Sequence, residues 1–223
     1  MNVCISRIPQ DESIAYPPSR CPKCKAKLKA YDLIPLISYL FLRGRCRYCG
    51  VRISARYPVV EALTAVLFLA FYVKAGPSVY FVDLVIFSIL LVLISFIDLE
   101  NLLIPDFLML IGIGTGLAYS VYNGSIIQSL TGACFGFLFM FLLSAAAKYA
   151  LKKEAMGEGD IKLLVMFGAN LGIERTLMSL VCASLTGAAV GLILISLKIL
   201  KRDDYIPFAP FLALGAIVSI LIW

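Results

Sequence analysis

Long apolar segments separated by short polar breaks make up residues 57–223. A helix needs about 20 mostly apolar residues to cross a bilayer, and in lipid only helices and closed barrels satisfy their backbone groups. The chain is 61% apolar and 15% charged, which is outside the range of soluble domains. We therefore predict an all-α, polytopic transmembrane helix bundle with seven segments, at 57–73, 79–97, 104–122, 126–147, 161–172, 176–198 and 207–223.

One predicted segment, 161–172, is short for a full crossing. We expect it to be covered by protein, kinked against its neighbour or partly re-entrant. Small residues at four-residue spacing let transmembrane helices approach closely. Three glycine pairs of this kind fall inside the segments, and we interpret them as packing positions rather than catalytic ones: Gly112 with Gly116, Gly132 with Gly136, and Gly187 with Gly191.

The distribution of Lys and Arg predicts which ends of the segments face the cytoplasm, because positively charged loops stay inside. If residues 1–56 are cytoplasmic, the alternation of crossings places 17 of the 20 Lys and Arg residues in cytoplasmic stretches. Lys162 lies just within a helix on the same side, and only Lys74 and Arg175 face outward. The acidic residues at the segment boundaries then gather at the cytoplasmic ends of the helices.

Four cysteines in the first 56 residues have the spacing of a metal site. Two C-x2-C pairs are separated by 21 residues, and four thiolates in a tetrahedral array suit zinc. Disulfides are less expected in a reducing compartment, and so are four unrelated thiols at this spacing. We predict a structural zinc ion held by Cys21, Cys24, Cys46 and Cys49. The predicted division is a cytoplasmic zinc-binding segment, 1–56, and a transmembrane domain, 57–223.

Two aspartates stand at segment boundaries. Asp98 ends an apolar run, and Asp160 closes Gly157-Glu158-Gly159-Asp160 directly before another. Ionisable groups at such places are functional hypotheses by default. Each also has a structural interpretation, Asp98 as an interfacial stop and Asp160 as a helix N-cap. A third aspartate, Asp106, has a similar one as a first-turn acid after Pro105.

The joint placement of Asp98 and Asp160 favours acid–base chemistry. Two carboxylates at the same membrane depth can share one proton, so that one acts as a base toward water and the other as an acid toward the leaving group. Gly157 and Gly159 would let a substrate backbone approach Asp160 closely. The chain has no histidine, which excludes Ser-His and Cys-His triads and a His-ligated catalytic metal.

An ordered set of motifs runs nearly end to end and resembles the type IV prepilin peptidases, the Gly-x-Gly-Asp membrane aspartyl proteases. The matching pieces are Asn2-Val3, Ser19-Arg20-Cys21-Pro22, Ile34-Pro35-Leu36-Ile37-Ser38-Tyr39, Gly44-Arg45-Cys46, Arg56-Tyr57-Pro58, Val60-Glu61, Asp98 with Pro105-Asp106, Gly157-x-Gly159-Asp160-x-Lys162, and Ile206-Pro207-Phe208-Ala209-Pro210-Phe211.

The resemblance implies a function for several of these residues. Asp98 and Asp160 become the catalytic pair of an aspartic endopeptidase. Asp106, Gly157, Glu158 and Gly159 become motif residues near the substrate.

The resemblance also implies the substrate and the cofactor. The expected substrates are type IV prepilins or pseudopilins, cut after the glycine of a short basic leader. The new N-terminal residue is then methylated with S-adenosylmethionine, and Gly44 and Glu61 are candidates for that reaction. We expect the acidic rim, including Glu154 and Glu158, to attract the basic leader.

The remaining expectations concern location and the N-terminus. We expect a multi-pass protein of the bacterial inner membrane, in contact with the lipid bilayer and with no nucleic acid, whose active site is at the cytoplasmic face. Met1 to Gln10 holds no apolar run of signal-peptide length. Family members usually carry a further hydrophobic helix before the motif that begins here at Asn2.

Two other functions are consistent with parts of the sequence. A non-enzymatic assembly factor could use the zinc segment for docking and the acids as helix caps. A transporter could relay protons through the aspartates, although transporters place such groups near the middle of the membrane. Cleavage of a prepilin-like peptide by the purified protein distinguishes both from a protease.

Overall fold

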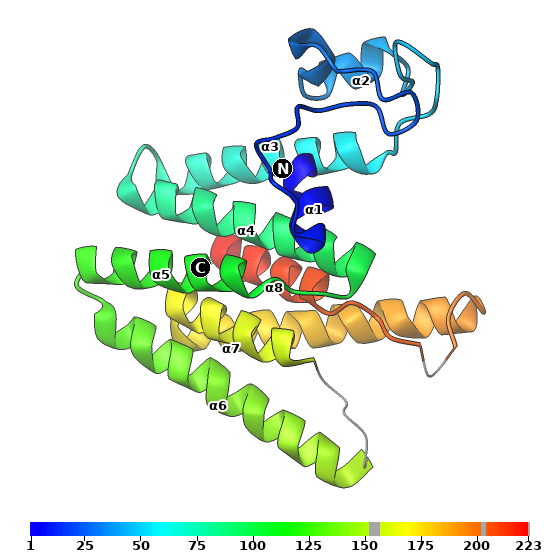
Figure 1. Ribbon diagram of the computed structural model, residues 1–223. Helices are drawn as coiled ribbons and strands as arrows, with labels where there is room; N and C mark the ends of the chain where they lie inside the picture. Colours follow the sequence, from blue (N-terminus) through cyan, green and yellow to red (C-terminus); the bar gives the residue numbers. More distant parts are fainter. Residues whose placement is uncertain (152–156, 202–203, 223) are drawn as a thin grey trace. The chain divides into compact units, whose positions relative to one another are not determined.

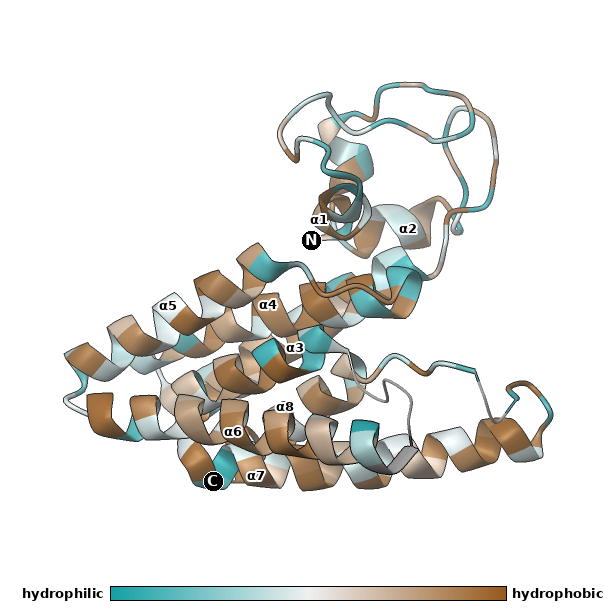
Figure 2. Ribbon diagram, turned by 60° about the horizontal axis from the view of Figure 1, so that its bottom comes forward, coloured by the Kyte–Doolittle hydropathy of each residue, from teal (hydrophilic) through white to brown (hydrophobic). Residues whose placement is uncertain are grey.

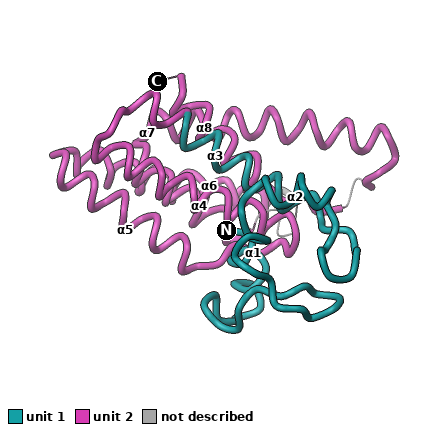
Figure 3. The backbone as a smooth tube through the Cα atoms, turned by 90° about the horizontal axis from the view of Figure 1, so that it is seen from above, with its two compact units in different colours: residues 1–69 teal, residues 70–223 magenta. Residues whose placement is uncertain are grey.

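A computed structural model of the chain describes residues 1–151, 157–201 and 204–222, and these residues form helices and their connections, with no strand among them. The chain forms two compact units, Met1–Leu69 and Ala70–Trp223 (Figure 3). The division falls inside one long helix, α3 (Arg56–Ala75), which begins in the first unit.

The first unit holds short helical turns around the beginning of α3. They are α1 (Asn2–Arg7), η1 (Ile8–Gln10), η2 (Ala30–Leu33) and α2 (Ile37–Phe41). α1 lies along the first turns of α3: Thr64 Oγ1 contacts Met1 Sδ at 3.1 Å, and an Arg56 guanidinium nitrogen donates to Ser6 Oγ at 2.9 Å. α1 therefore runs antiparallel to α3, with its first residues beside Thr64 and its last residues beside Arg56. The segment that follows α1 begins at the N-terminal end of α3.

The second unit is a helix bundle (Figure 1) of α4 (Val79–Asn101), α5 (Asp106–Tyr122), α6 (Ile126–Leu151), α7 (Glu158–Ser196) and α8 (Ala209–Ile222). Among the described helices, α3, α4, the described part of α6 and α7 are long and apolar enough to cross a membrane, and α5 and α8 are shorter apolar helices. Apolar residues cover much of these helices in Figure 2. The bundle thus agrees with the predicted all-α membrane fold.

α7 is two helical arms joined at a break. Gly172 has φ 74° and ψ −178°, a backbone conformation open to glycine but not to residues with a side chain. The first arm runs toward the beginning of α4: Phe167 packs on Phe87, and Arg175, just after the break, bonds Tyr80. The second arm comes back, because Gly191 lies beside Ile206 just before α8, and the first residue of α8, Ala209, bonds Asp98 near the end of α4. The arms therefore run in opposite directions, as Figure 1 shows, and each half serves as a separate segment.

The short predicted segment 161–172 corresponds to the first arm. Leu163, Leu164, Met166 and Phe167 have no exposed surface. The expectations of protein cover and of a kink against the next segment are both confirmed.

Glycines bring the helices together, as predicted. A Cβ on Gly132 or Gly136 of α6 would overlap the backbone of α7 at Gly168 or Leu164. On α5, a Cβ at Gly112 would overlap Met166, and one at Gly116 would lie 2.7 Å from Asn170. In the second arm, a Cβ on Gly187 would lie 3.5 Å from Phe211, and one on Gly191 would lie 3.2 Å from Ile206, near the beginning of α8.

Candidate active site and metal centre

Asp98 lies one turn before the end of α4. The helix ends after Asn101, where Leu102 adopts a left-handed conformation and its N–H donates to the carbonyl of Asp98 at 2.9 Å. The Asp98 side chain is only 6% exposed, and its Oδ2 accepts a hydrogen bond from the backbone N–H of Ala209 at 3.1 Å. Asp98 is therefore buried in the bundle, against the interfacial-stop interpretation.

The partner of Asp98 is the first residue of α8. The first N–H groups of a helix have no partner within that helix and carry a partial positive charge. A carboxylate from α4 satisfies one of them here, so the Asp98 side chain is held in place by backbone of a second helix. The sequence has no direct signal for this contact, because any residue can supply a backbone N–H. Pro207 and Pro210 indicate only where the last helix begins.

Asp160 lies in the first turn of α7. The N-cap of the helix is Gly157, so the alternative of Asp160 as an N-cap is wrong. A Cβ on Gly157 would lie 3.6 Å from Asp160 Oδ2, whereas a Cβ on Gly159 would lie 3.0 Å from Ile104 of the α4–α5 connection. Gly157 leaves space beside the carboxylate, and Gly159 packs against that connection.

The fold brings the two aspartates together. Asp98 stands one turn before the end of α4 and Asp160 in the first turn of α7, so the two carboxylates lie at the same end of the bundle. Among the described residues, neither aspartate has an ion pair with Lys or Arg. The described residues at this end therefore include one buried and one part-buried carboxylate with no cation beside either.

Asp106 and Glu158 lie at the same end of the bundle. Asp106 begins α5, as the first-turn interpretation predicted, and its Oδ1 pairs with Lys162 Nζ at 2.7 Å. Its side chain is 66% exposed, and Glu158 is also exposed. Glu154, the other acid expected at this rim, lies outside the described residues.

The four predicted metal ligands meet in the first unit. The sulfur atoms of Cys21, Cys24, Cys46 and Cys49 lie within 4.8 Å of one another, and the sulfurs of Cys21 and Cys49 are 3.9 Å apart. Four sulfurs bound to one zinc ion at about 2.3 Å would lie about 3.8 Å from each other. The cluster could hold a metal ion of this kind.

The two cysteine pairs stand on matching turns. In the first, the N–H of Lys25 donates to the carbonyl of Cys21, and in the second the N–H of Gly50 donates to that of Cys46, both at 2.9 Å. Lys25 and Gly50 have positive φ values of 58° and 70°. Each turn therefore points its two sulfurs the same way, which is the geometry a shared ion needs.

The environment of the thiols separates their pKa values. The backbone N–H of Cys24 stabilises the Cys21 thiolate and lowers its pKa to about 7. At Cys49 the backbone N–H of Val51 acts to lower the pKa, but burial and the neighbouring sulfurs of the cluster outweigh it and raise the pKa to about 11. A bound cation would offset the crowding of these sulfurs.

The two methyl-transfer candidates, Gly44 and Glu61, both contact the α2 segment. Glu61 Oε2 accepts a hydrogen bond from the Leu36 N–H at 2.8 Å. Gly44 has φ 67°, and a Cβ there would lie 2.9 Å from the ring of Tyr39. Their observed contacts fix α2 in place; the sequence alone did not predict this role.

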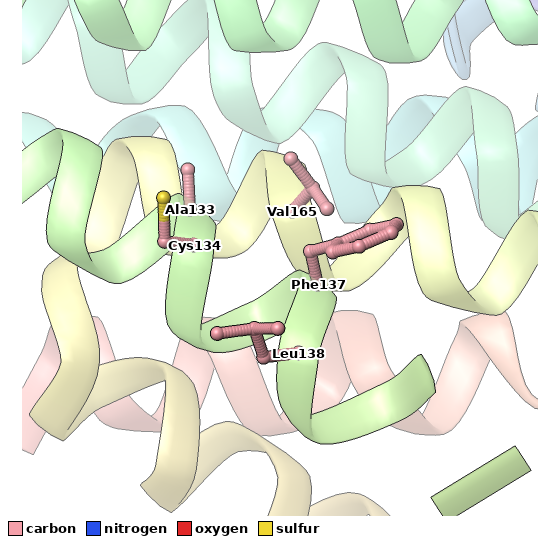
Figure 4. Close-up of a pocket in the computed structure, with 5 residues that line it drawn as sticks. All are labelled: Ala133, Cys134, Phe137, Leu138 and Val165. Carbon is pink, nitrogen blue, oxygen red and sulfur yellow. The ribbon is translucent and has the colours of Figure 1, made fainter. Parts of the chain in front are cut away.

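An apolar hollow of about 380 Å³ lies between α6 and the first arm of α7 (Figure 4). It is lined by Ala133, Cys134, Phe137, Leu138 and Val165. The lining has no carboxylate, and its one thiol, Cys134, has no histidine to activate it because the chain contains none, so the hollow lacks an acid–base pair for peptide hydrolysis. The aspartates remain the candidate chemical centre.

Comparison with known proteins adds two family models and several relatives. Residues 1–75 match a model described as the bacterial peptidase A24 N-terminal domain, and residues 85–192 match the type IV leader peptidase family. The chain is 39% identical over 222 residues to a prepilin leader peptidase/N-methyltransferase of Aeromonas hydrophila, covering 96% of this chain and 77% of that protein.

Two further relatives carry the same description. The protein from Bacillus subtilis is 34% identical over 96% of this chain and 86% of its own length. The one from Myxococcus xanthus is 40% identical over 87% of this chain and 59% of its own length. No solved structure matches the chain.

Proposed function

The chain belongs to the type IV leader peptidase family, and on that premise we propose that it is a membrane aspartyl endopeptidase whose catalytic pair is Asp98 and Asp160. It removes the short basic leader of type IV prepilins or pseudopilins and N-methylates the residue that cleavage exposes. The assembly-factor and transporter alternatives do not account for this membership.

The convergence of the two carboxylates at one end of the bundle carries the proposal. With one proton between them, the ionised carboxylate takes a proton from the attacking water. The protonated one donates its proton to the carbonyl oxygen. When the C–N bond breaks, the first carboxyl gives the proton it took from water to the leaving amine. The second takes back a proton from the hydroxyl as the carbonyl re-forms, so the pair again holds one proton. The N–H of Ala209 orients Asp98, and the burial of Asp98 keeps other water away from its carboxylate.

The surroundings of the pair support a basic substrate at the cytoplasmic face. Exposed acids, Asp106 and Glu158, lie at the same end, and they would attract the Lys and Arg residues of a leader. The excess of Lys and Arg in the connections at that end supports a cytoplasmic position in the inner membrane. Gly157 leaves space for a substrate backbone beside Asp160.

The first unit contributes a metal centre and, we propose, the methyl-transfer function. Four thiolates close the coordination shell of a zinc ion, so the ion would be structural and would hold the two turns together. S-adenosylmethionine would supply the methyl group when bound. Gly44 and Glu61 are the candidate residues for that site.

Replacement of each aspartate tests the catalytic pair. Asp98→Asn and Asp160→Asn should each lower the rate of leader cleavage by about 100-fold or more, because each removes a proton-transfer group. Purified protein in detergent is incubated with a leader-bearing prepilin peptide, and the products are read by mass spectrometry. Recovery of the variants from the membrane fraction shows that they still insert.

Asp83→Asn is the matched control. Asp83 is also in α4 and is also buried, 8% exposed against 6% for Asp98, but it stands near the other end of the helix. This variant should cleave at close to the normal rate. Normal cleavage by Asp98→Asn or by Asp160→Asn would refute the pair.

A further inference from the structure

A cluster of large apolar side chains is exposed on and just before α2. Phe41 is 85% exposed and Leu40 is 73% exposed, although both are in a short helix whose other face is packed. The α2 apolar face consists of Leu33, Ile34, Ile37, Leu40 and Phe41, all of them at least 44% exposed. A contiguous surface of this kind normally has an occupant.

The packed side of α2 is fixed to the rest of the first unit. A Cβ on Gly44 would lie 2.9 Å from the Tyr39 ring, and Tyr39 Oη donates to the carbonyl of Ile53 at 3.4 Å. At its beginning, the N–H of Leu36 donates to Glu61. The apolar face therefore points outward because the opposite side is held by Tyr39, not because the segment lacks structure.

The bond to Glu61 sets the level of α2 along α3. α3 is long and apolar enough to cross a membrane, and Glu61 stands five residues after its first residue, Arg56. That is about 7.5 Å along the helix axis at 1.5 Å per residue. Val59 and Leu63, on either side of Glu61, are 51% and 38% exposed, as expected for side chains that meet lipid.

This level matches that of an interfacial helix. Such helices bury their apolar side about 5–10 Å deep, at the boundary between headgroups and acyl chains. α2 begins beside the part of α3 that would lie at this depth. Its apolar face would then enter the same leaflet that α3 enters.

Basic residues follow the apolar face directly. Arg43, Arg45 and Arg52 are exposed, and the isolated bridge between residues 45 and 52 places the last two side by side. An apolar centre with neighbouring arginines fits an anionic bilayer surface. It fits a basic prepilin leader poorly, because like charges repel.

We propose that α2 is an interfacial membrane anchor of the first unit. The α2 apolar face lies in the headgroup region of the leaflet, and Arg43, Arg45 and Arg52 contact anionic headgroups. The anchor fixes the depth of the metal centre relative to the bilayer surface.

Tryptophan fluorescence in lipid tests the anchor. Trp223 is the only Trp of the chain, so a Trp223→Phe background makes each new Trp the sole reporter. In this background, Phe41→Trp is compared with Tyr16→Trp in the full chain, reconstituted into vesicles of brominated anionic lipid. Tyr16 is the matched control, since it is also aromatic and is 76% exposed. Its neighbour Pro17 accepts a hydrogen bond from Arg7, the last residue of α1, which places Tyr16 on the side of Arg56 away from the membrane-spanning part of α3.

The expected result is a blue-shifted emission from the Phe41→Trp protein that brominated lipid quenches, with the emission of the Tyr16→Trp protein unshifted and unquenched. The same emission from both proteins would overturn the anchor, and so would a blue shift in Phe41→Trp without quenching, which would indicate a protein occupant. Equal quenching in neutral and anionic lipid would overturn the role of the arginines. Metal content and leader cleavage show that each variant is folded, and Leu40→Trp replaces Phe41→Trp if it is not.

Discussion

At the scale of single residues, two aspartates of one motif have different environments. Asp98 is buried and bonds the first N–H of α8, whereas Asp106, eight residues later in sequence, is exposed and pairs with Lys162. The Asp98 carboxylate has no cation beside it among the described residues, whereas the Asp106 carboxylate is engaged by the Lys162 ammonium group. Environment therefore selects Asp98 for the proposed chemistry.

The variant Asp106→Asn should behave unlike Asp98→Asn. An exposed ion pair contributes little, so its loss should lower the free energy of unfolding by less than about 1 kcal/mol. Leader cleavage should remain readily measurable. Thermal unfolding in detergent and the peptide assay check the two expectations, and an Asp106→Asn protein as inactive as Asp98→Asn would contradict the distinction.

Part of this site is readable in the sequence. The lysine and arginine distribution and the lengths of the apolar segments predict that Asp98 and Asp160 lie at one end of the bundle. The bond from Ala209 and the pair between Asp106 and Lys162 were not predicted. Both depend on how separate helices pack, which no local pattern records.

At the scale of elements, α7 is defined by its break. The sequence predicted a short, covered segment next to a longer one, because 161–172 is too short to cross alone. It did not predict that the helical turns continue through the break, from Glu158 to Ser196, with the reversal at Gly172. Positive φ at a single glycine is set by the packing on both sides of it.

Replacing Gly172 should destabilise the bundle. In Gly172→Ala the new Cβ meets a positive φ of 74° and the Gln128 side chain at 2.9 Å. Strain of this kind costs about 1–3 kcal/mol. Thermal unfolding in detergent should show a lower midpoint.

Gly114→Ala provides the comparison for that variant. Gly114 is in α5 with nothing within 4 Å of a Cβ, so alanine should be neutral or slightly stabilising there. Equal stability of the Gly172 and Gly114 variants would contradict the account of the break.

At the scale of the whole molecule, two compact units divide the proposed functions. The metal centre is in residues 1–69, and Asp98, Asp160 and Ala209 are all in residues 70–223. The division at 56/57 was argued from composition, whereas the compact units divide within α3, because Met1, Asn2 and Ser6 contact its first turns. Contacts between distant segments are not visible in composition.

Removal of the metal should separate the two activities. A strong chelator, or the variant Cys21→Ser, should eliminate bound zinc and N-methylation while leader cleavage persists, because the aspartates belong to the second unit. Cys134→Ser, outside the cluster, should keep both the metal and both activities. Elemental analysis and mass spectrometry of the peptide products provide the readout, and parallel loss of cleavage and methylation would count against separate roles.

The central claim is that Asp98 and Asp160 act as one unit around a shared proton. Residual single-turnover cleavage rates of Asp98→Asn, Asp160→Asn and the double variant measure this directly. Groups that act together are strongly non-additive, so the double variant should be no slower than the slower single variant. A double variant slowed by the product of the two separate effects would show that the aspartates act independently and would contradict the account.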